Sequence, residues 1–160
     1  MKIEPSKIHE VVLFSPQIFK DTRGFFMETW NRREFAKLGF THDFVQDNFT
    51  SSKKDTLRGI HYQLQNPQGK LIRVAKGEIF DVAVDLRRTS ATFGQWAGFR
   101  LCAEDHQLLW IPPGFGHGFL ALKDDSEVIY KCTDYYNPAA ERCIVWNDPA
   151  IGIDWPLVEG

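Results

Sequence analysis

The sequence predicts an all-β fold, an antiparallel sandwich or jelly roll that carries one short helix. Three observations support this prediction. Seven or more short apolar runs alternate with polar residues at a period of two, single Gly and Pro residues separate the runs, and aromatic residues make up 14% of the chain. Many short strands with little helix are typical of two packed antiparallel sheets.

Size and composition indicate one globular domain. The 160 residues are enough to bury a core without disulfides or a metal, and no repeat or linker divides them, so we expect a single domain over residues 1–160. A net charge of -2 gives no basic excess for a nucleic-acid partner. The N-terminus is charged and no stretch is apolar enough to span a bilayer, so we expect a cytoplasmic protein with no membrane partner.

One helix is expected near residue 35. Asn31 is a suitable N-cap, and Glu34 follows three residues later, as in a capping box. Phe35 and Leu38 would share one face, and Gly39 would end the helix.

The clearest strand covers residues 79–86. Its apolar side chains at positions 80, 82, 84 and 86 share one face, whereas Asp81 and Asp85 take the other. We therefore expect Asp81 and Asp85 to be solvated carboxylates. Similar runs occur at 44–45, 71–74, 99–101, 108–111, 127–130 and 143–146.

Two polar residues stand on apolar strand faces. Lys70 shares the face of Ile72, so its ammonium either points into the core, where burial would lower its pKa, or reaches solvent from a strand end. Tyr130 shares the face of Val128. Taken alone, Tyr130 is a core residue with one hydrogen bond.

Two of the five histidines, His61 and His117, lie in apolar strand or turn surroundings, whereas the other three lie among polar residues and should be solvated. A lone histidine in such a place is usually structural. Two of them on separate strands, together with a lysine and a tyrosine, are compatible with a proton-transfer site.

A metal site is the alternative use of these residues. The segment from Pro112 to His117 resembles the second motif of metal-binding cupins, whose first motif supplies a His-x-His pair and a Glu. Here that pair reads His61-Tyr62-Gln63 and no Glu follows before Glu78. Two imidazoles fall short of the usual ligand set, and the three cysteines form no C-x-x-C pair. We therefore expect no metal.

Seven motifs in one order carry a resemblance to a known family. They are FKDTRGFFME at 19–28, QDN at 46–48, LRGIHYQ at 57–63, QGKL at 68–71, IPPGFGHGF at 111–119, YKCTDYY at 130–136 and WNDP at 146–149. Over nearly its whole length the chain resembles the dTDP-4-dehydrorhamnose 3,5-epimerase family.

The resemblance implies a cupin-type jelly roll, a homodimer with exchanged N-terminal strands, and action on dTDP-4-dehydro-6-deoxyglucose without a cofactor. It implies that His61 is the general base, Tyr130 the acid and Lys70 the neighbour of the C4 ketone oxygen. The implied substrate-binding residues are Arg23, Phe26, Glu28, Gln46, Asn48, Arg58, His117 and Glu141, with Tyr136 stacked on thymine.

The residue types suit this chemistry. A proton next to a ketone can be removed if the resulting enolate is stabilised, and a lysine cation in a low-dielectric pocket does so without a metal. Inversion then needs a donor on the opposite face, and a tyrosine hydroxyl holds its proton at neutral pH. Arginines such as Arg23 and Arg58 bind phosphate in a bidentate manner.

Two points need a structural answer. Arg58 and His61 have opposite parity on one strand, so both reach one pocket only if Gly59 permits a bulge or bend. The family usually continues past a segment like Asp154-Trp155-Pro156 into a tail with an Asp that pairs with the base and a Lys that touches the ligand, whereas this sequence ends at Gly160. We expect either a truncated form or a base that works without that partner.

Three other functions stay open at this point. The first is an epimerase restricted to C3 or C5, and the second is a nucleotide-sugar binder without catalysis, suggested by the tail. The third is a metal-dependent cupin oxygenase, suggested by the segment that ends at His117.

Overall fold

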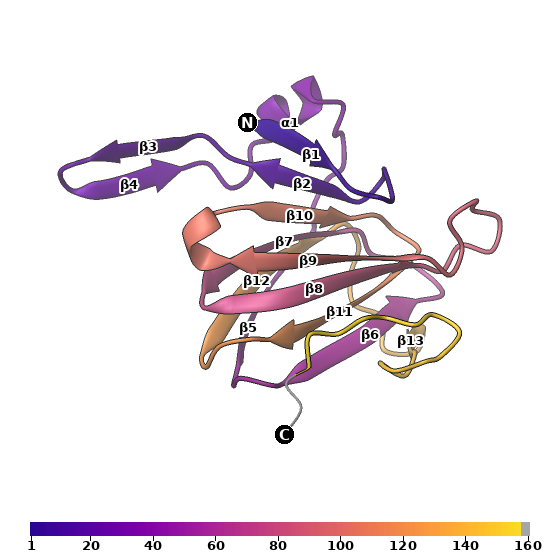
Figure 1. Ribbon diagram of the computed structural model, residues 1–160. Coiled ribbons are helices and arrows are strands. Elements are labelled where there is room, and N and C mark those ends of the chain that lie inside the picture. The colour runs from indigo at the N-terminus through magenta and orange to yellow at the C-terminus, as the bar shows by residue number, and fades with distance from the viewer. Residues whose placement is uncertain (158–160) are drawn as a thin grey trace.

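Two β-sheets packed face to face form the body of the protein, and a third, smaller sheet projects from it (Figure 1). The computed structural model describes residues 1–157, so residues 158–160 of the expected domain lie outside the described residues. The larger sheet has six strands in the order β1 (Lys2–Pro5), β2 (Val12–Ser15), β10 (Leu108–Ile111), β7 (Lys70–Lys76), β12 (Ser126–Cys132) and β5 (Gln46–Ser52).

The second sheet of the sandwich has five strands. Their order is β13 (Glu141–Cys143), β6 (Leu57–Gln63), β11 (Phe115–Ala121), β8 (Glu78–Asp85) and β9 (Trp96–Cys102). Neighbouring strands in both sheets pair antiparallel. The predicted all-β antiparallel sandwich is therefore confirmed.

The main core fills the space between the sheets. It joins residues of the larger sheet to residues of the second, among them Ile72, Leu109 and Val128 on one side and Ile79 and Phe119 on the other. Alternate residues along each strand face this layer, as the period-two pattern predicts. A short 3-10 turn, η1 (Ala103–Asp105), connects β9 to β10.

The predicted helix is α1 (Arg32–Lys37). The side chain of Asn31 accepts hydrogen bonds from the backbone N–H groups of Arg33 and Glu34, so the N-cap is confirmed. The second half of the capping box is wrong, because the Glu34 carboxylate accepts a hydrogen bond from Lys37 at 2.7 Å instead.

Only part of the expected apolar helix face is buried. Phe35 is fully buried among Phe14, Phe40 and Trp30, whereas Leu38 is 37% exposed. Leu38 is the C-cap, where the chain leaves the helix, so it no longer follows the helical face. Gly39 follows with φ +82° and ends the helix as predicted.

Strand β8 differs from its prediction, because both of its faces are buried. Asp81 and Asp85 are 0% exposed and face the interior of the sandwich, so the expectation of solvated carboxylates is wrong. The opposite face, with Val82 and Val84, is covered by the C-terminal segment that includes Trp155. Alternation along one strand cannot reveal this second covering layer.

Asp85 has a structural role. Its carboxylate accepts hydrogen bonds from Arg87, Ser90 and Thr92, which fix the loop between β8 and β9. Burial alone would raise the pKa of this carboxyl, but the hydrogen bonds, led by that from Arg87, lower it well below its usual range.

Two predicted strands have different ends. The run at 44–45 precedes β5, which begins at Gln46, because Phe44 packs on Trp30 and Trp110. The run at 143–146 contains only the end of β13, although Ile144 still exchanges backbone hydrogen bonds with Ile60.

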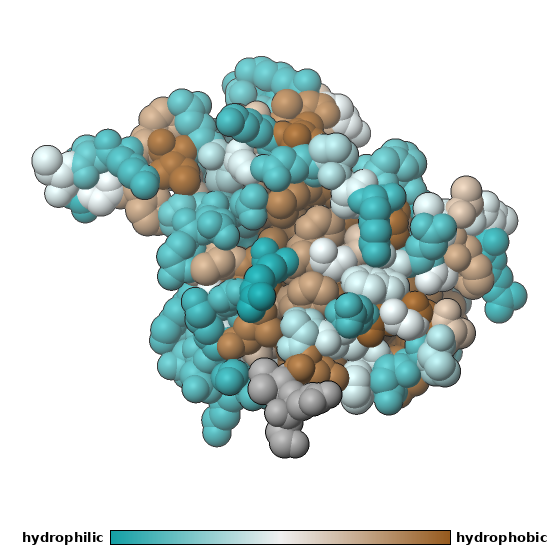
Figure 2. Space-filling model, in the orientation of Figure 1, coloured by the Kyte–Doolittle hydropathy of each residue, from teal (hydrophilic) through white to brown (hydrophobic). Residues whose placement is uncertain are grey.

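The third sheet is a hairpin of β3 (Ile18–Asp21) and β4 (Gly24–Met27), which extends away from the sandwich in Figure 1. Phe19, Phe25 and Phe26 on this hairpin are each more than half exposed. Figure 2 shows apolar surface on the projecting arm beside hydrophilic residues. Within residues 1–157, no helix combines the length and apolar character needed to cross a membrane.

Candidate active site

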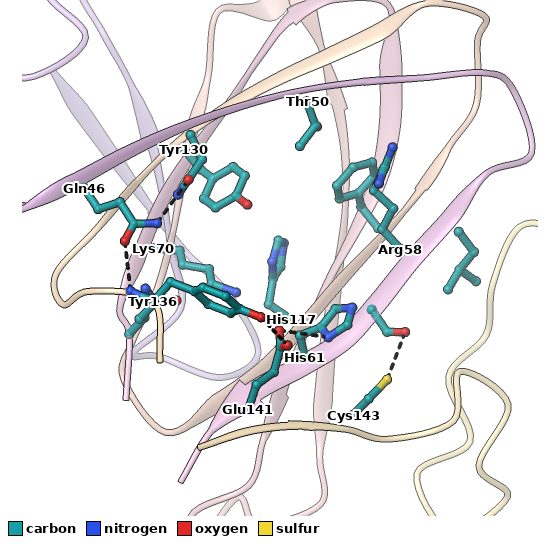
Figure 3. Close-up of a pocket in the computed structure, with 15 residues that line it drawn as sticks. Gln46, Thr50, Arg58, His61, Lys70, His117, Tyr130, Tyr136, Glu141 and Cys143 are labelled. Atoms are coloured by element: carbon teal, nitrogen blue, oxygen red, sulfur yellow. Dashed lines mark hydrogen bonds and ion pairs between the residues drawn. The ribbon is translucent and has the colours of Figure 1, made fainter. Parts of the chain in front are cut away.

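A cavity of about 630 Å³ lies between the two sheets, at the side formed by β5 and β6. One wall comes from β5, β7 and β12 of the larger sheet, and the facing wall comes from β6, β11 and β13. Figure 3 shows the side chains that point into it. The lining residues are Gln46, Asn48, Thr50, Leu57, Arg58, Gly59, His61, Gln68, Lys70, His117, Phe119, Tyr130, Tyr136, Glu141 and Cys143.

The side chain of Lys70 points into the cavity from the larger sheet. It stands at the start of β7, directly opposite Cys132 of β12. Burial lowers the pKa of the Lys70 ammonium, and this effect is opposed by Cys132, Asp81 and Glu141. Of the two orientations that the sequence left open, Lys70 adopts the inward one and does not reach solvent from the strand end.

Tyr130 lies on the same wall, two residues along β12 from Cys132. Its cross-strand partner on β5 is Asn48, which also lines the cavity. Burial raises the pKa of the Tyr130 phenol, with a smaller opposing effect from Arg58. The hydroxyl therefore stays protonated at neutral pH and can act as a proton donor.

His61 faces this pair from the other sheet. Its Nδ1 lies 3.4 Å from Oε1 of Glu141, and its side chain is 47% exposed. The other carboxylate oxygen of Glu141 accepts a hydrogen bond from the Tyr136 hydroxyl at 2.8 Å. Figure 3 shows Glu141 between the His61 and Tyr136 rings. Glu141, expected as a ligand contact, is thus also the carboxylate neighbour of the histidine.

A second imidazole is buried behind the first. His117 on β11 is the cross-strand partner of His61, and its Nε2 lies 3.0 and 3.1 Å from the two carboxylate oxygens of Asp81. Burial lowers the pKa of His117, while Asp81 opposes this effect. Strand parity had assigned Asp81 to solvent. In the structure its carboxylate is buried and holds His117 at the site.

The parity conflict between Arg58 and His61 is resolved by a bulge. His117 pairs with His61 and Phe119 with Arg58, so the three residue steps from Arg58 to His61 on β6 lie opposite only two steps on β11. Gly59 lies in this bulge with φ +124°, and a Cβ there would be 2.4 Å from the Cα of Gly118. Both side chains thus reach the same cavity, as the sequence required.

The mouth of the cavity is organised by Gln46. Its amide donates to Asn48 at 3.1 Å, and its carbonyl oxygen accepts from the backbone N–H of Tyr136 at 2.9 Å. These bonds hold the Tyr136 ring at the cavity edge (Figure 3), where its flat face can stack on a base.

Three predicted ligand contacts lie outside the cavity of their own chain. Arg23 is fully exposed and pairs with Asp21, Phe26 is 64% exposed on β4, and Glu28 accepts a hydrogen bond from Asn31. All three belong to the projecting hairpin or to the segment after it, and the cavity of the same chain is lined without them.

Besides Asp81, which lies behind the cavity wall as the partner of His117, sequence reasoning missed several residues that line the cavity. Thr50, Phe119 and Cys143 carry no feature that separates them from ordinary strand residues. Only the register of β5, β11 and β13 could have found them. Among residues 1–157, no group of three or more His, Cys, Asp or Glu side chains is arranged to hold a metal ion.

The arrangement is suited to proton transfer at carbon. An imidazole on one wall and a protonated phenol on the other can act on opposite faces of a bound ring. The Lys70 ammonium can stabilise negative charge that develops on a neighbouring oxygen. The cavity brings together His61, Lys70, Tyr130 and six of the nine predicted binding residues.

Comparisons with known proteins identify relatives along nearly the whole chain. A family profile described as dTDP-4-dehydrorhamnose 3,5-epimerase matches residues 5–159. A protein of that name from Neisseria gonorrhoeae is 55% identical over 98% of this chain, which spans 48% of that relative's length. One from Pseudomonas aeruginosa is 54% identical over 98% of this chain and 87% of the relative.

Solved structures agree with these sequence matches. The structure of dTDP-6-deoxy-D-glucose-3,5-epimerase from Legionella pneumophila, in complex with dTDP-4-keto-L-rhamnose, has a TM-score of 0.95 and 50% sequence identity. The match covers 99% of this chain and 85% of that one.

Proposed function

The chain belongs to the dTDP-4-dehydrorhamnose 3,5-epimerase family and is a carbohydrate epimerase, and we propose that His61, Tyr130 and Lys70 invert C3 and C5 of dTDP-4-dehydro-6-deoxyglucose. The product is dTDP-4-dehydro-L-rhamnose. One observation carries the proposal: the imidazole and the phenol line opposite walls of one cavity, and the ammonium lies beside them.

The reaction consists of two proton transfers at each carbon. His61 removes the proton from a carbon next to the C4 ketone, and the electron pair moves onto the ketone oxygen. The Lys70 ammonium stabilises this enolate, because charge is more strongly stabilised in a partly desolvated site. Tyr130 then delivers its proton from the opposite face. His61 returns its proton to solvent and Tyr130 regains one, which resets the site.

Two carboxylates support the imidazoles. We assign to Glu141 the orientation of His61, because its oxygen faces Nδ1 and leaves Nε2 free for the substrate. Asp81 holds His117, which lies buried behind His61 and lines the sugar end of the cavity. Arg58 serves the diphosphate, and Tyr136 stacks on the thymine.

The hairpin supplies the remaining contacts in a homodimer. Arg23, Phe26 and Glu28 lie outside their own chain's cavity, and the exposed phenylalanines of β3 and β4 need a covering surface. We assign these three residues to the cavity of a second copy, through exchanged N-terminal strands. Cytoplasmic action is part of the proposal, and the three free cysteines of residues 1–157 suit a reducing compartment.

The experiment is product analysis by NMR with purified variants. Wild-type protein should convert dTDP-4-dehydro-6-deoxyglucose to the product inverted at both carbons. His61→Ala should lower kcat at least about 100-fold, and Tyr130→Phe should also lose inversion. His42→Ala, at an exposed histidine that does not line the cavity, is the matched control and should keep wild-type activity. Full inversion by both site variants would contradict the assigned roles.

A further inference from the structure

Gln63 at the end of β6 is a buried polar residue that the steps above leave unused. It occupies the place of the second histidine in the His-x-His pair discussed above, and only 7% of the residue is exposed. A side-chain amide has two N–H donors and an oxygen acceptor, and burying them unpaired costs free energy. The partners of this amide therefore indicate what the residue does.

Both ends of the Gln63 amide bond to the backbone of other segments. Its Nε2 donates to the carbonyl oxygen of Asn66 at 2.8 Å and to that of Tyr135 at 3.3 Å. Its Oε1 accepts from the backbone N–H of Asn137 at 2.9 Å. Asn66 belongs to the connection between β6 and β7, whereas Tyr135 and Asn137 belong to the connection between β12 and β13. Gln63 thus ties together two connections that each run from one sheet to the other.

These bonds hold the backbone on both sides of Tyr136. Gln63 bonds to the carbonyl of the residue before it and to the N–H of the residue after it. Gln46 accepts from the N–H of Tyr136 itself at 2.9 Å (Figure 3). Both peptide groups that flank Tyr136 are therefore held by side-chain amides, one from β5 and one from β6. Because Tyr136 is 51% exposed, packing holds its ring only in part, and the ring depends on this backbone for its position.

We propose that Gln63 is a positioning residue for nucleotide recognition, whose amide holds the backbone of Tyr136 so that the ring is placed to stack on the base. The inference rests on the proposed function, in which Tyr136 stacks on the thymine. The base takes no part in the reaction, so the stack contributes equally to the bound substrate and to the transition state. Loss of the Gln63 amide should therefore raise KM and leave kcat nearly unchanged.

The test compares the binding of dTDP with that of pyrophosphate, which has no base. Gln63→Met keeps an unbranched side chain of similar length but cannot donate to either carbonyl. It should raise the Kd for dTDP about fivefold, the size expected for the loss of one aromatic stack, and leave the Kd for pyrophosphate unchanged. Gln65→Met is the matched control, because Gln65 is an exposed glutamine of the same connection that does not line the cavity. It should keep both affinities within about twofold of wild type.

A double-mutant cycle separates positioning of Tyr136 from a general structural effect. In a Tyr136→Leu background the ring is absent, so Gln63→Met should change the Kd for dTDP by less than about twofold. A residue that only stabilises the fold would cause the same loss of affinity with and without the ring.

Four results would overturn the inference. They are an unchanged Kd for dTDP in Gln63→Met, an equal loss for dTDP and pyrophosphate, an equal loss with and without the Tyr136 ring, and a fall in kcat at unchanged KM. If Gln63→Met does not fold, Gln63→Glu replaces it with the same expected rise in Kd, because a carboxylate keeps the acceptor for Asn137 and loses both donors. Wild-type protein that inverts the sugar while Gln63→Met binds dTDP normally would refute this inference alone. Wild-type protein that does not bind dTDP would refute the proposed function.

Discussion

At the scale of single residues, the charge state of Lys70 limits the proposed reaction. The ammonium must be charged to stabilise the enolate, and burial lowers its pKa. Tyr130 has its pKa raised by burial, so the acid stays protonated as the pH increases. Burial thus brings the deprotonation of the lysine to lower pH and moves that of the tyrosine to higher pH.

The lowered pKa of Lys70 predicts the alkaline limb of kcat/KM, which reports groups of the free enzyme. The value should fall as the pH rises through the lowered pKa of Lys70. Lys70→Arg should be slower, because the guanidinium is placed differently, but its limb should move to higher pH because arginine stays charged. The check is kcat/KM from pH 6 upward for both proteins. A limb at the same pH in Lys70→Arg would assign it to another group.

Parity along strands identified Lys70 and Tyr130 but failed for Asp81. Lys70 and Tyr130 stand on strands with apolar residues on one face and polar residues on the other. This is the pattern of a strand that is buried on one face only. Strand β8 is covered twice, by the sandwich core and by the segment around Trp155. An inward carboxylate on such a strand looks like a solvated one, and its partner His117 lies 36 residues away in sequence.

At the scale of elements, the bulge in β6 determines where two functional side chains point. It changes the parity between Arg58 and His61, and close packing of Gly59 on Gly118 permits it. The sequence indicated the need for this bulge, since two site residues of opposite parity shared one strand. The short β13 was only partly predictable, because its pairing with β6 is long-range.

Gly59→Ala should therefore destabilise the fold and weaken activity. Its methyl group would lie 2.4 Å from a backbone atom, and we expect a loss of about 3 kcal/mol in the free energy of unfolding. Gly94→Ala is the matched control: it also has a positive φ, +78°, but nothing lies within 4 Å of its added Cβ. The control should lose about 1 kcal/mol and keep activity. Equal losses in denaturant unfolding would contradict the role of close packing.

At the scale of the whole molecule, the projecting hairpin predicts cavities completed by a second chain. Neither its placement nor its partner follows from local patterns: Phe25 lies against His106 of its own chain, but the three phenylalanines of β3 and β4 all stay more than half exposed. Arg23 and His61 would then serve the same cavity from different chains. This arrangement can be tested with hybrid dimers.

A hybrid of an Arg23→Ala chain and a His61→Ala chain, isolated through two different tags, should regain activity. One of its two cavities would combine an intact His61 with an intact Arg23 from the other chain. At substrate concentrations below KM the hybrid should reach about half of the wild-type rate, while each variant homodimer stays nearly inactive. A hybrid as inactive as its parents would place Arg23 in its own chain's cavity or outside the site.

The central claim is proton exchange at two carbons by groups on opposite walls of one cavity. It is tested most directly by incubating dTDP-4-dehydro-6-deoxyglucose with the protein in deuterated water and locating the label by NMR and mass spectrometry. We expect one deuterium at C3 and one at C5 of the inverted product, and no label at either carbon with His61→Ala. Inversion without deuterium uptake, or label at both carbons with His61→Ala, would contradict the mechanism.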